Sequence, residues 1–346
     1  MARSLRRASP ITLLLGLILC GGFLVFFLTP TDTTVSTSSK SASQRPSKPP
    51  PVKHYKLNGL TTSNDPKTNR ETVLILTPMA KFYDQYWNNL LALTFPRDLI
   101  ELGFIVPNSR EGNIVLGKLQ KAIDKVQSGP KAHRFAGVTV LRQDFDVPVS
   151  QNEKDRHALA AQKERRAAMA KARNSLVFTT LGPTIAWVMW LDADIVETPH
   201  TLIEDLAMHN KDIIVPNCYQ RYTENGVQKI RPYDFNSWHE SETALKMAEK
   251  LGPDDIIVEG YKEIATWRSL MAYELKDGGQ IHAETKLDGV GGTVLLVKAE
   301  VHRDGAMFPP FAFYHLIETE GFAKMAKRLG YQPWGLPNYL VYHYNE

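Results

Sequence analysis

Two aspartates, Asp192 and Asp194, follow directly on an unbroken run of large apolar residues, 186–191. Such a run predicts a strand buried on both faces, as in the middle of a parallel sheet. Side chains at positions i and i+2 of extended backbone point the same way, so both carboxylates are expected beyond the carboxyl end of this strand. Open α/β sheets bind ligands at that edge.

Two like charges at such short range repel each other, and a divalent cation beside them relieves the repulsion. The position of Asp192 and Asp194 after a buried strand therefore predicts a metal site. The alternative is that one or both carboxylates cap the next helix or solvate a turn.

Apolar segments and helical patterns alternate along the chain around this strand. Other strands are predicted at 72–77, 99–107, 137–141, 212–216 and 294–297. Helices are predicted at 83–91, 114–126, 153–178, from Pro199, and at 238–251, 258–273 and 321–329. This alternation favours an α/β fold, with an open, mainly parallel sheet flanked by helices and joined by right-handed crossovers. The glycine-rich loop 288–293 is not a Walker loop, because no Gly-Lys-Ser/Thr follows it.

The N-terminal region predicts a membrane-anchored protein. Residues 11–28 are almost entirely apolar and follow three arginines, so a helix there would span roughly 27 Å, close to the hydrocarbon thickness of a bilayer. A cleaved signal peptide is the alternative, but its apolar region has only about 7–15 residues. The positive-inside rule leaves residues 1–10 in the cytosol and places the rest in a lumen. Residues 29–55 are rich in Ser, Thr, Pro and Lys and predict a flexible stalk before a folded domain at 56–346.

Composition excludes some classes of function. The formal charge is only +4, and much of the basic excess lies in the tail and stalk, so no basic stripe for nucleic acid remains. The two cysteines, Cys20 in the apolar run and Cys218 in the body, are not expected to pair, so the core holds the fold. No Asn-x-Ser/Thr glycosylation site occurs in the chain.

Six segments resemble motifs of a known family and occur in the family's order. They are Leu-Thr-Pro-Met at 76–79, Phe-Pro-Arg-Asp-Leu-Ile-Glu-Leu-Gly-Phe at 95–104, Lys-Ala-Arg-Asn at 171–174, Trp-Leu-Asp-Ala-Asp at 190–194, Asp-Gly-Val-Gly-Gly-Thr at 288–293 and Pro-Asn-Tyr-Leu-Val-Tyr-His at 337–343. Together they resemble the GT-A class of glycosyltransferases and, more closely, the fungal mannan polymerase family of Golgi α-1,6-mannosyltransferases. Within that family the chain is most similar to the subunit shared by the mannan polymerase complexes.

The resemblance implies a single lumenal GT-A-like domain with type II topology in the membrane of the Golgi, its cis part in particular. It implies GDP-mannose as donor, Mn²⁺ as cofactor and an α-mannoside acceptor on N-glycans, with the α-1,6-linked mannan backbone elongated with retention of configuration. It also implies related mannosyltransferase subunits as partners in a hetero-complex. Two alternatives remain: a mainly structural subunit that organises a catalytic partner, and the same fold acting on a UDP-sugar.

The family pattern assigns the metal to Asp192, Asp194 and His343, with Asp194 as direct ligand and Asp192 as a further ligand, a ribose contact or a catalytic group. Carboxylates and imidazole together suit Mn²⁺, which accepts both oxygen and nitrogen. Without the family, His343 would be interpreted as an exposed histidine near a frayed terminus.

The same pattern assigns the nucleotide to two segments. Thr77, Pro78 and Met79 would cradle the guanine, the alternative being a proline that simply ends a strand. Arg173 and Asn174 would reach the nucleotide or its phosphates, the alternative being the solvated face of a helix.

Asp288, just before the glycines, is a candidate for binding sugar hydroxyls or stabilising the reacting centre, the alternative being a turn former. Aromatic and charged side chains of the last third would line the acceptor groove, namely Trp267, Arg268, His315, Glu318 and Glu320.

Overall fold

The computed structural model describes residues 51–144 and 161–345. The chain divides into two units, Met1–His54 and Tyr55–Glu346, and the elements below lie in the second. Within the described ranges no helix is long and apolar enough to cross a membrane. The predicted anchor at 11–28, most of the predicted stalk and Cys20 lie outside these ranges.

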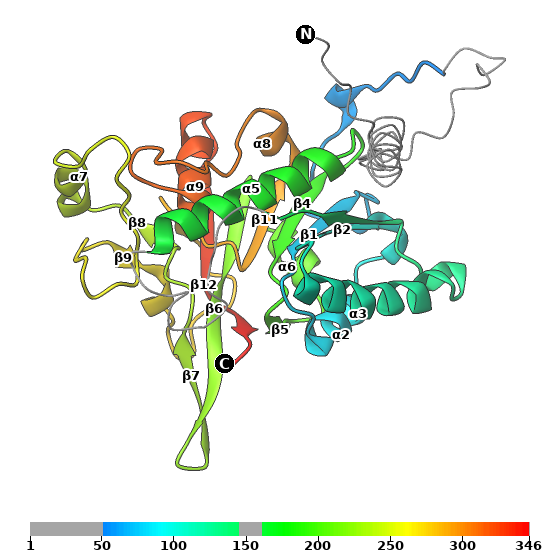
Figure 1. Ribbon diagram of the computed structural model, residues 1–346, viewed down its shortest axis with the longest axis horizontal. Helices are drawn as coiled ribbons and strands as arrows, with labels where there is room; N and C mark the ends of the chain where they lie inside the picture. The colour runs from blue at the N-terminus through cyan, green and yellow to red at the C-terminus, as the bar shows by residue number, and fades with distance from the viewer. Residues whose placement is uncertain (1–50, 145–160, 346) are drawn as a thin grey trace, which may run out of the picture. The chain divides into compact units, whose positions relative to one another are not determined.

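A ten-stranded sheet runs through the second unit, in the order β10-β12-β6-β11-β4-β1-β2-β3, with β5 added beside β12 and β7 beside β6 (Figure 1). Parallel pairs join β3, β2, β1 and β4, and also β6 and β12, whereas β11 runs antiparallel between β4 and β6. The predicted α/β fold with a parallel central sheet is therefore confirmed. The strands are β1 (Val73–Pro78), β2 (Ile100–Val106), β3 (Gly137–Arg142), β4 (Trp187–Leu191), β5 (Ile195–Glu197), β6 (Ile213–Glu224), β7 (Val227–Pro232), β10 (Thr285–Lys286), β11 (Val294–Lys298) and β12 (Pro333–His343).

Helices cover both faces of this sheet, and Figure 1 shows α5 crossing it in front. One set of helices is α2 (Asp84–Ala92), α3 (Arg110–Gln127) and α6 (Leu202–Ala207); the other is α5 (Gln162–Thr180), α8 (Ala299–Arg303) and α9 (Glu318–Arg328). Val73 and Ile75 of β1 pack with the first set, and Leu74 and Leu76 pack with the second. Because both faces are covered, the central strands consist of unbroken apolar residues, as the sequence predicted.

Most of the predicted helices are confirmed. The patterns at 83–91, 114–126 and 321–329 correspond to α2, α3 and α9. The helix predicted at 153–178 is observed as α5, and its first residues lie outside the described part of the chain. Short 3-10 helices complete the connections at Leu57–Gly59, Arg97–Leu99, Lys131–His133 and Met271–Tyr273.

The helix predicted at 258–273 is wrong. This segment is irregular and ends in the two-residue strand β9 (Ser269–Leu270) and a 3-10 helix. Gly260 has a φ of +84° and Trp267 a φ of +56°, and backbone in this left-handed region cannot continue a right-handed helix.

The helix predicted at 238–251 is only partly correct. Its first residues form β8 (Trp238–His239), which pairs with β9, and a helix forms only afterwards as α7 (Glu242–Ala248). Ser241 caps α7 by accepting a hydrogen bond from the backbone N–H of Ala244. Tertiary packing decides the first part, because the indole of Trp238 is fully buried beneath the guanidinium of Arg268.

The strand β6 is longer than the sequence predicted, and the strand β12 was not predicted. β6 continues well past the predicted 212–216 and turns at Asn225-Gly226, both with positive φ, into β7. Asn-Gly is the preferred pair for such a hairpin turn. β12 pairs in parallel with β6, although its prolines and glycine weaken a strand pattern.

His302 is a buried histidine on α8 whose two ring nitrogens are both used. Its Nε2 accepts a hydrogen bond from the indole of Trp190 at 3.2 Å, and its Nδ1 donates to the carbonyl of Ala306 at 2.8 Å. Burial lowers the pKa of His302 to about 4, because a charged imidazolium cannot be solvated there.

We therefore expect a pH dependence of stability that depends on His302. Between pH 6.5 and about 4 the unfolded chain binds a proton on this histidine and the native chain does not, so the native state loses up to roughly 3 kcal/mol as the pH falls through this window. Urea unfolding of wild-type and His302→Gln chains at pH 7 and pH 4.5 measures the difference. The variant should lose less stability on acidification. Equal losses in the two chains would contradict the assignment.

Candidate functional site

Asp192 and Asp194 lie in a turn at the carboxyl end of β4. The backbone N–H of Asp192 donates to the carbonyl of Thr293 at 2.9 Å. The carbonyl of Asp192 accepts a hydrogen bond from the backbone N–H of Ile195 at 3.1 Å, so the chain turns here before β5. The extended backbone expected at these two residues is therefore not observed, although both carboxylates lie beyond the carboxyl end of β4 as predicted. They bind different partners, although their charges still interact.

The carboxylate of Asp194 meets the imidazole of His343, a residue 149 positions later in the sequence. Asp194 Oδ2 lies 3.0 Å from His343 Nε2, and the backbone N–H of Tyr344 donates to the Asp194 carbonyl at 2.7 Å. His343 is the last residue of β12, is 3% exposed and stacks on Tyr233 with ring centroids 3.6 Å apart. The prediction that the C-terminal segment packs down, with His343 beside the aspartates, is confirmed.

The donor chemistry of this pair fits a divalent cation. His343 Nδ1 lies 2.7 Å from the carbonyl of Tyr344, so Nδ1 carries the ring proton. Nε2 then faces the Asp194 carboxylate with either a second proton or a lone pair, and a lone pair is what a metal requires. Across the described residues no set of three or more His, Cys, Asp or Glu side chains is arranged to hold a metal ion. Asp194 contributes a carboxylate and His343 an imidazole to this pair, and Asp192 contacts Arg173.

Asp192 is held by Arg173 of α5. Arg173 Nη2 lies 2.9 Å from Asp192 Oδ1 and 3.2 Å from Oδ2, and Arg173 Nε donates to Glu318 Oε1 at 3.2 Å. Arg173 is 1% exposed, and its guanidinium lies over the rings of both Trp190 and Phe308, with its central carbon 5.3 and 5.6 Å from the ring centroids. Its Nη1 is buried and has no hydrogen-bond partner among the described residues.

Negative charge exceeds positive charge around this turn. Burial is the largest cause that raises the pKa of Asp192, to about 7; the charges of Asp194 and Glu318 act in the same direction, and Arg173 opposes them. A bound cation would reverse this balance and keep all three carboxylates ionised.

The end of β1 lies next to this turn, because Leu76 pairs with Trp190. The hydroxyl of Thr77 is hydrogen-bonded to Tyr86 at 2.5 Å, and the charge of Asp192 contributes to the raised pKa of Tyr86, whose largest cause is burial. Thr77 and Met79 are buried, and Pro78 is partly exposed. The structure thus brings the predicted guanine segment beside the aspartates.

Arg173 and Asn174 point into the protein and not onto a solvated helix face. Arg173 clamps Asp192, as described above, and the Asn174 side chain donates to the carbonyl of Phe308 at 2.7 Å and accepts from its N–H at 3.0 Å. Their contacts fix the segment at Phe308 and the carboxylate of Asp192.

Asp288 lies in a different hydrogen-bond network. One carboxylate oxygen accepts from the backbone N–H of Glu240 at 2.8 Å, and the other is paired with Lys327 of α9. Burial acts to raise the pKa of Asp288, but Glu240 N–H and Lys327 together lower it below its usual value. Glu318, and not Asp288, is the carboxylate that shares Arg173 with Asp192.

The residues predicted for the acceptor groove divide into an interior network and an exposed surface. Arg268 is paired with Glu240 and Glu259 at 2.8 Å each, and Glu320 with Arg166 at 2.6 Å. All of these ions except the partly exposed Glu240 are buried. Arg166 of α5 donates to Asn236 at 2.8 Å, and the indole of Trp238 donates to Glu320 of α9 at 2.8 Å, which holds the segment after β7 against both helices.

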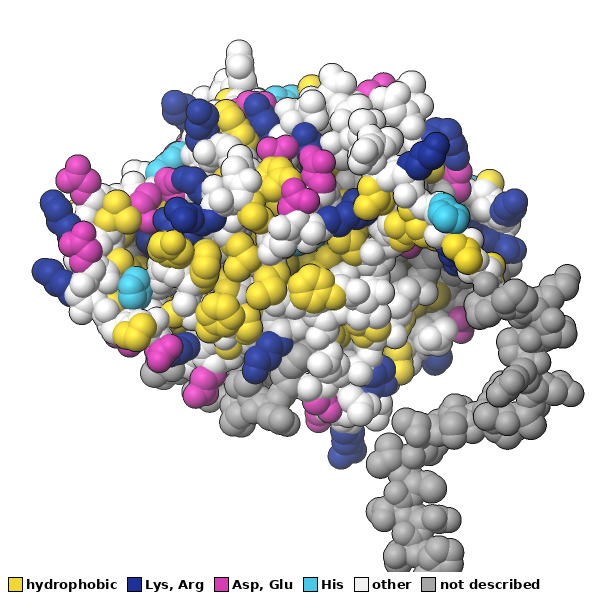
Figure 2. Space-filling view, turned by 90° about the horizontal axis from the view of Figure 1, so that it is seen from above, with side chains coloured by type: hydrophobic (Ala, Val, Ile, Leu, Met, Phe, Trp, Pro, Cys, Tyr) yellow, Lys and Arg dark blue, Asp and Glu magenta, His cyan; other side chains and the backbone are white. Residues whose placement is uncertain are grey.

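Trp267, in contrast, is 76% exposed, and His315 is partly exposed with Nδ1 3.0 Å from the Asp255 carbonyl. Both have positive φ, as do Tyr314 and Glu318. Strained backbone of this kind persists where surrounding contacts hold it and clusters at functional sites. Hydrophobic side chains also gather in a band between charged groups on the face that Figure 2 shows.

Several residues at the site were not predicted to have a role there. Tyr233 stacks on His343, and the hydroxyl of Tyr86 is hydrogen-bonded to that of Thr77. Asp234 accepts a hydrogen bond from the hydroxyl of Thr293 at 3.1 Å. Tyr86 belongs to a helical pattern that predicts only core packing, and Tyr233 and Asp234 belong to no motif. Only the tertiary structure identifies them.

Comparison with known proteins places the chain in a family. The Anp1 family model matches residues 51–312. The mannan polymerase complex subunit MNN9 of Candida albicans is 57% identical over 297 residues, which are 85% of this chain and 80% of that protein. The mannan polymerase complex subunit mnn9 of Schizosaccharomyces pombe is 57% identical over 84% of this chain and 86% of that protein.

A relative of lower identity is also named as a mannan polymerase subunit. The mannan polymerase II complex ANP1 subunit of Saccharomyces cerevisiae is 38% identical over 302 residues, which are 86% of this chain and 60% of that protein. With a family model over most of its length and relatives of this identity and coverage, the chain belongs to the Anp1 family.

Proposed function

We propose that this protein is a Golgi α-1,6-mannosyltransferase that uses GDP-mannose and Mn²⁺, with retention of configuration, as a subunit of a mannan polymerase complex. The observation that carries the proposal is the Asp194–His343 pair, 3.0 Å apart, beside an Asp192 held by Arg173 at the carboxyl end of β4. Relatives named as mannan polymerase complex subunits, at 57% identity, support the acceptor and the assembly. A GT-A-like domain in the lumen, behind a membrane anchor at residues 11–28, completes the proposal.

In this proposal Asp194 and His343 would hold the cation. A cation bound there would act as a Lewis acid toward the charge of a departing nucleoside diphosphate. Arg173 keeps Asp192 in place, and its buried Nη1 is a donor available to a ligand oxygen. The segment Thr77–Met79, beside Asp192, would contact the base.

The reacting bond is the one between the anomeric carbon and the phosphate oxygen. An α-linked donor that gives an α-linked product requires no strong general base of the kind an inverting enzyme needs, so none is assigned. Exposed Trp267 presents an aromatic face to an acceptor sugar.

The experiment is a transfer assay with the purified full chain. Mannose should pass from GDP-mannose to a linear α-1,6-mannoside in Mn²⁺, and chelation by EDTA should remove at least about 99% of the rate, because diphosphate departure loses its Lewis acid. UDP-mannose in place of GDP-mannose is the donor control. Metal-independent transfer would contradict the cation assignment. A chain that is inactive alone but supports a partner's transfer would favour the structural role.

A further inference from the structure

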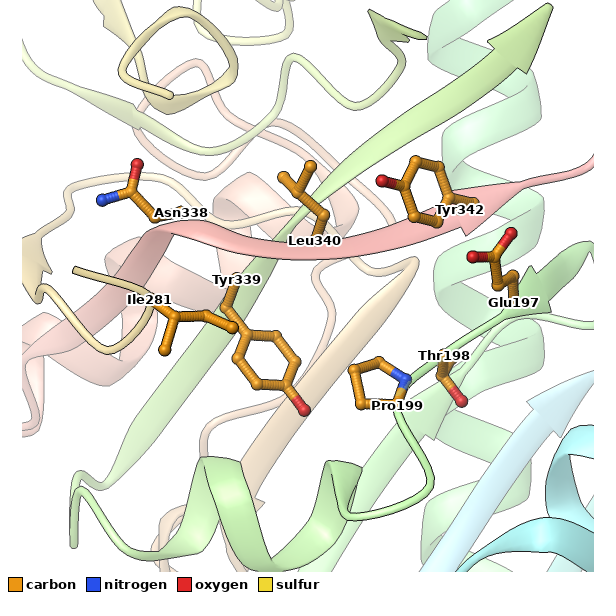
Figure 3. A pocket seen from close by; sticks show the side chains of 8 residues that line it. All are labelled: Glu197, Thr198, Pro199, Ile281, Asn338, Tyr339, Leu340 and Tyr342. Carbon is orange, nitrogen blue, oxygen red and sulfur yellow. The ribbon is translucent and has the colours of Figure 1, made fainter. Parts of the chain in front are cut away.

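A cavity lies beside β12. It has a volume of about 390 Å³, is partly open to solvent, and is lined by the segment at the end of β5, the loop before β10, and β12 itself (Figure 3). Its lining residues are Glu197, Thr198, Pro199, Ile281, Asn338, Tyr339, Leu340 and Tyr342.

The cavity exists because β12 lacks a neighbour along part of one edge. β6 pairs along one side of β12, while on the other side β10 pairs at Gly335 and β5 pairs at Tyr342. Between these two pairings the register with β6 is interrupted from Leu336 to Leu340. The diverging strands leave a gap lined by both backbone and side chains.

One end of the cavity has a fixed carboxylate beside an aromatic ring. Arg221 holds Glu197 with two hydrogen bonds of 2.8 Å, and its guanidinium stacks over the ring of Tyr342 at 3.7 Å. Figure 3 shows Glu197 and Tyr342 close together at this end. Arg221, which is itself about half exposed, thus contacts both groups at this end of the cavity.

The other end is apolar and equally well anchored. Asn338 accepts from the backbone N–H of Lys276 and donates to the carbonyl of Gln280, both at 2.9 Å, which ties the loop carrying Ile281 to β12. The hydroxyl of Tyr339 donates to Asp205 at 2.7 Å. Figure 3 shows the Tyr339 ring between Ile281 and Pro199.

The lining selects for a neutral ligand with an apolar face and hydroxyl groups. None of the lining side chains is a cation, so a nucleotide or phosphate finds no counter-charge among them. The one carboxylate, Glu197, is already paired with Arg221, so a metal ion is not expected either. Aromatic and aliphatic surface with a carboxylate, a hydroxyl and an amide suits the C–H faces and hydroxyl edges of a pyranose. The volume falls in the range of small-molecule sites.

The cavity is joined to the reacting site through two paired strands. Tyr342 directly precedes His343, and Glu197 follows Asp194 by three residues. Tyr342 lines the cavity, and the next residue, His343, lies 3.0 Å from Asp194.

We infer that this cavity is a second mannoside-binding site, which holds a sugar of the acceptor chain away from the reacting end. The inference rests on the proposed function for the identity of the sugar. It assigns to β12 two tasks, cation binding at His343 and acceptor holding at the residues that line the cavity.

The test uses binding without metal or donor. Calorimetry of the full chain with linear α-1,6-mannotetraose should give a dissociation constant that rises at least 10-fold in Ile281→Arg, which fills the cavity from its exposed rim, and in Thr198→Lys, which fills it from the other end. Ile230→Arg, an exposed position on β7, is the matched control and should bind as the wild type does. Asp194→Asn should also retain tetraose binding. Thermal unfolding confirms that each variant is folded.

The kinetic arm separates this site from the reacting one. Ile281→Arg should raise KM for the tetraose and leave kcat, and KM for methyl α-mannoside, unchanged. Equal tetraose binding in Ile281→Arg and wild type, or no binding to any of these chains, would overturn the inference. Ile281-dependent binding without any transfer would instead overturn the proposed function and leave the sugar site standing.

Discussion

Replacing Asp194 with asparagine is expected to lower transfer from GDP-mannose at least about 100-fold and to remove its dependence on Mn²⁺. The substitution keeps the shape of the side chain but removes the negative charge that faces His343 Nε2. If Asp194 holds a cation as proposed, the variant would remove its anionic ligand, and the expected loss of rate corresponds to roughly 3 kcal/mol or more of transition-state stabilisation. Initial rates across a Mn²⁺ series, together with calorimetry of GDP binding in Mn²⁺, measure both effects.

The matched control is Glu224→Gln, which removes an exposed carboxylate paired with Lys229 on the β6–β7 hairpin. It should leave rate and metal dependence unchanged. His343→Ala should resemble Asp194→Asn in the Mn²⁺ series, because it removes the second donor of the same pair. Wild-type rates in Asp194→Asn would rule out this pair as the cation site. Full activity of an assembled complex that carries Asp194→Asn would favour the structural role.

Replacing Arg173 with methionine is expected to lower the free energy of unfolding by about 3–5 kcal/mol. Methionine retains much of the apolar stem, but Asp192 and Glu318 lose their shared counter-charge in a buried setting. Breaking a buried ion pair from one side leaves uncompensated charge, which costs far more than the pair contributes. Urea unfolding followed by tryptophan fluorescence measures the loss.

Two comparisons make the result specific to buried charge. Arg70→Met breaks an exposed pair with Asp98 and should change the unfolding free energy by at most about 1 kcal/mol. The double variant Arg173→Met, Glu318→Gln should be less destabilised than the sum of its single variants, since Glu318→Gln removes one of the stranded charges. Additive losses would show that Arg173 acts through packing on Trp190 and Phe308 and not through charge.

The regular half of the fold could be predicted because its signals are local. The apolar residues of β1, β4 and β11 are buried on both faces, and α2, α3 and α9 carry their apolar residues at helical spacing. The segment 258–273 could not be predicted, because its backbone follows from side chains far apart in sequence. Trp267 has a positive φ, and Arg268 is held by Glu240 and Glu259.

The amino-acid sequence by itself determined that a buried strand delivers two aspartates to the carboxyl edge of a sheet, and its motifs assigned His343 to them. Tertiary structure alone decided the partners: β12 pairs with β6 and β5, which brings His343 to Asp194, while α5 presents Arg173 to Asp192. Spacing along one strand cannot specify such partners, because each depends on the order in which distant strands and helices pack. The same packing leaves the gap beside β12 that forms the cavity.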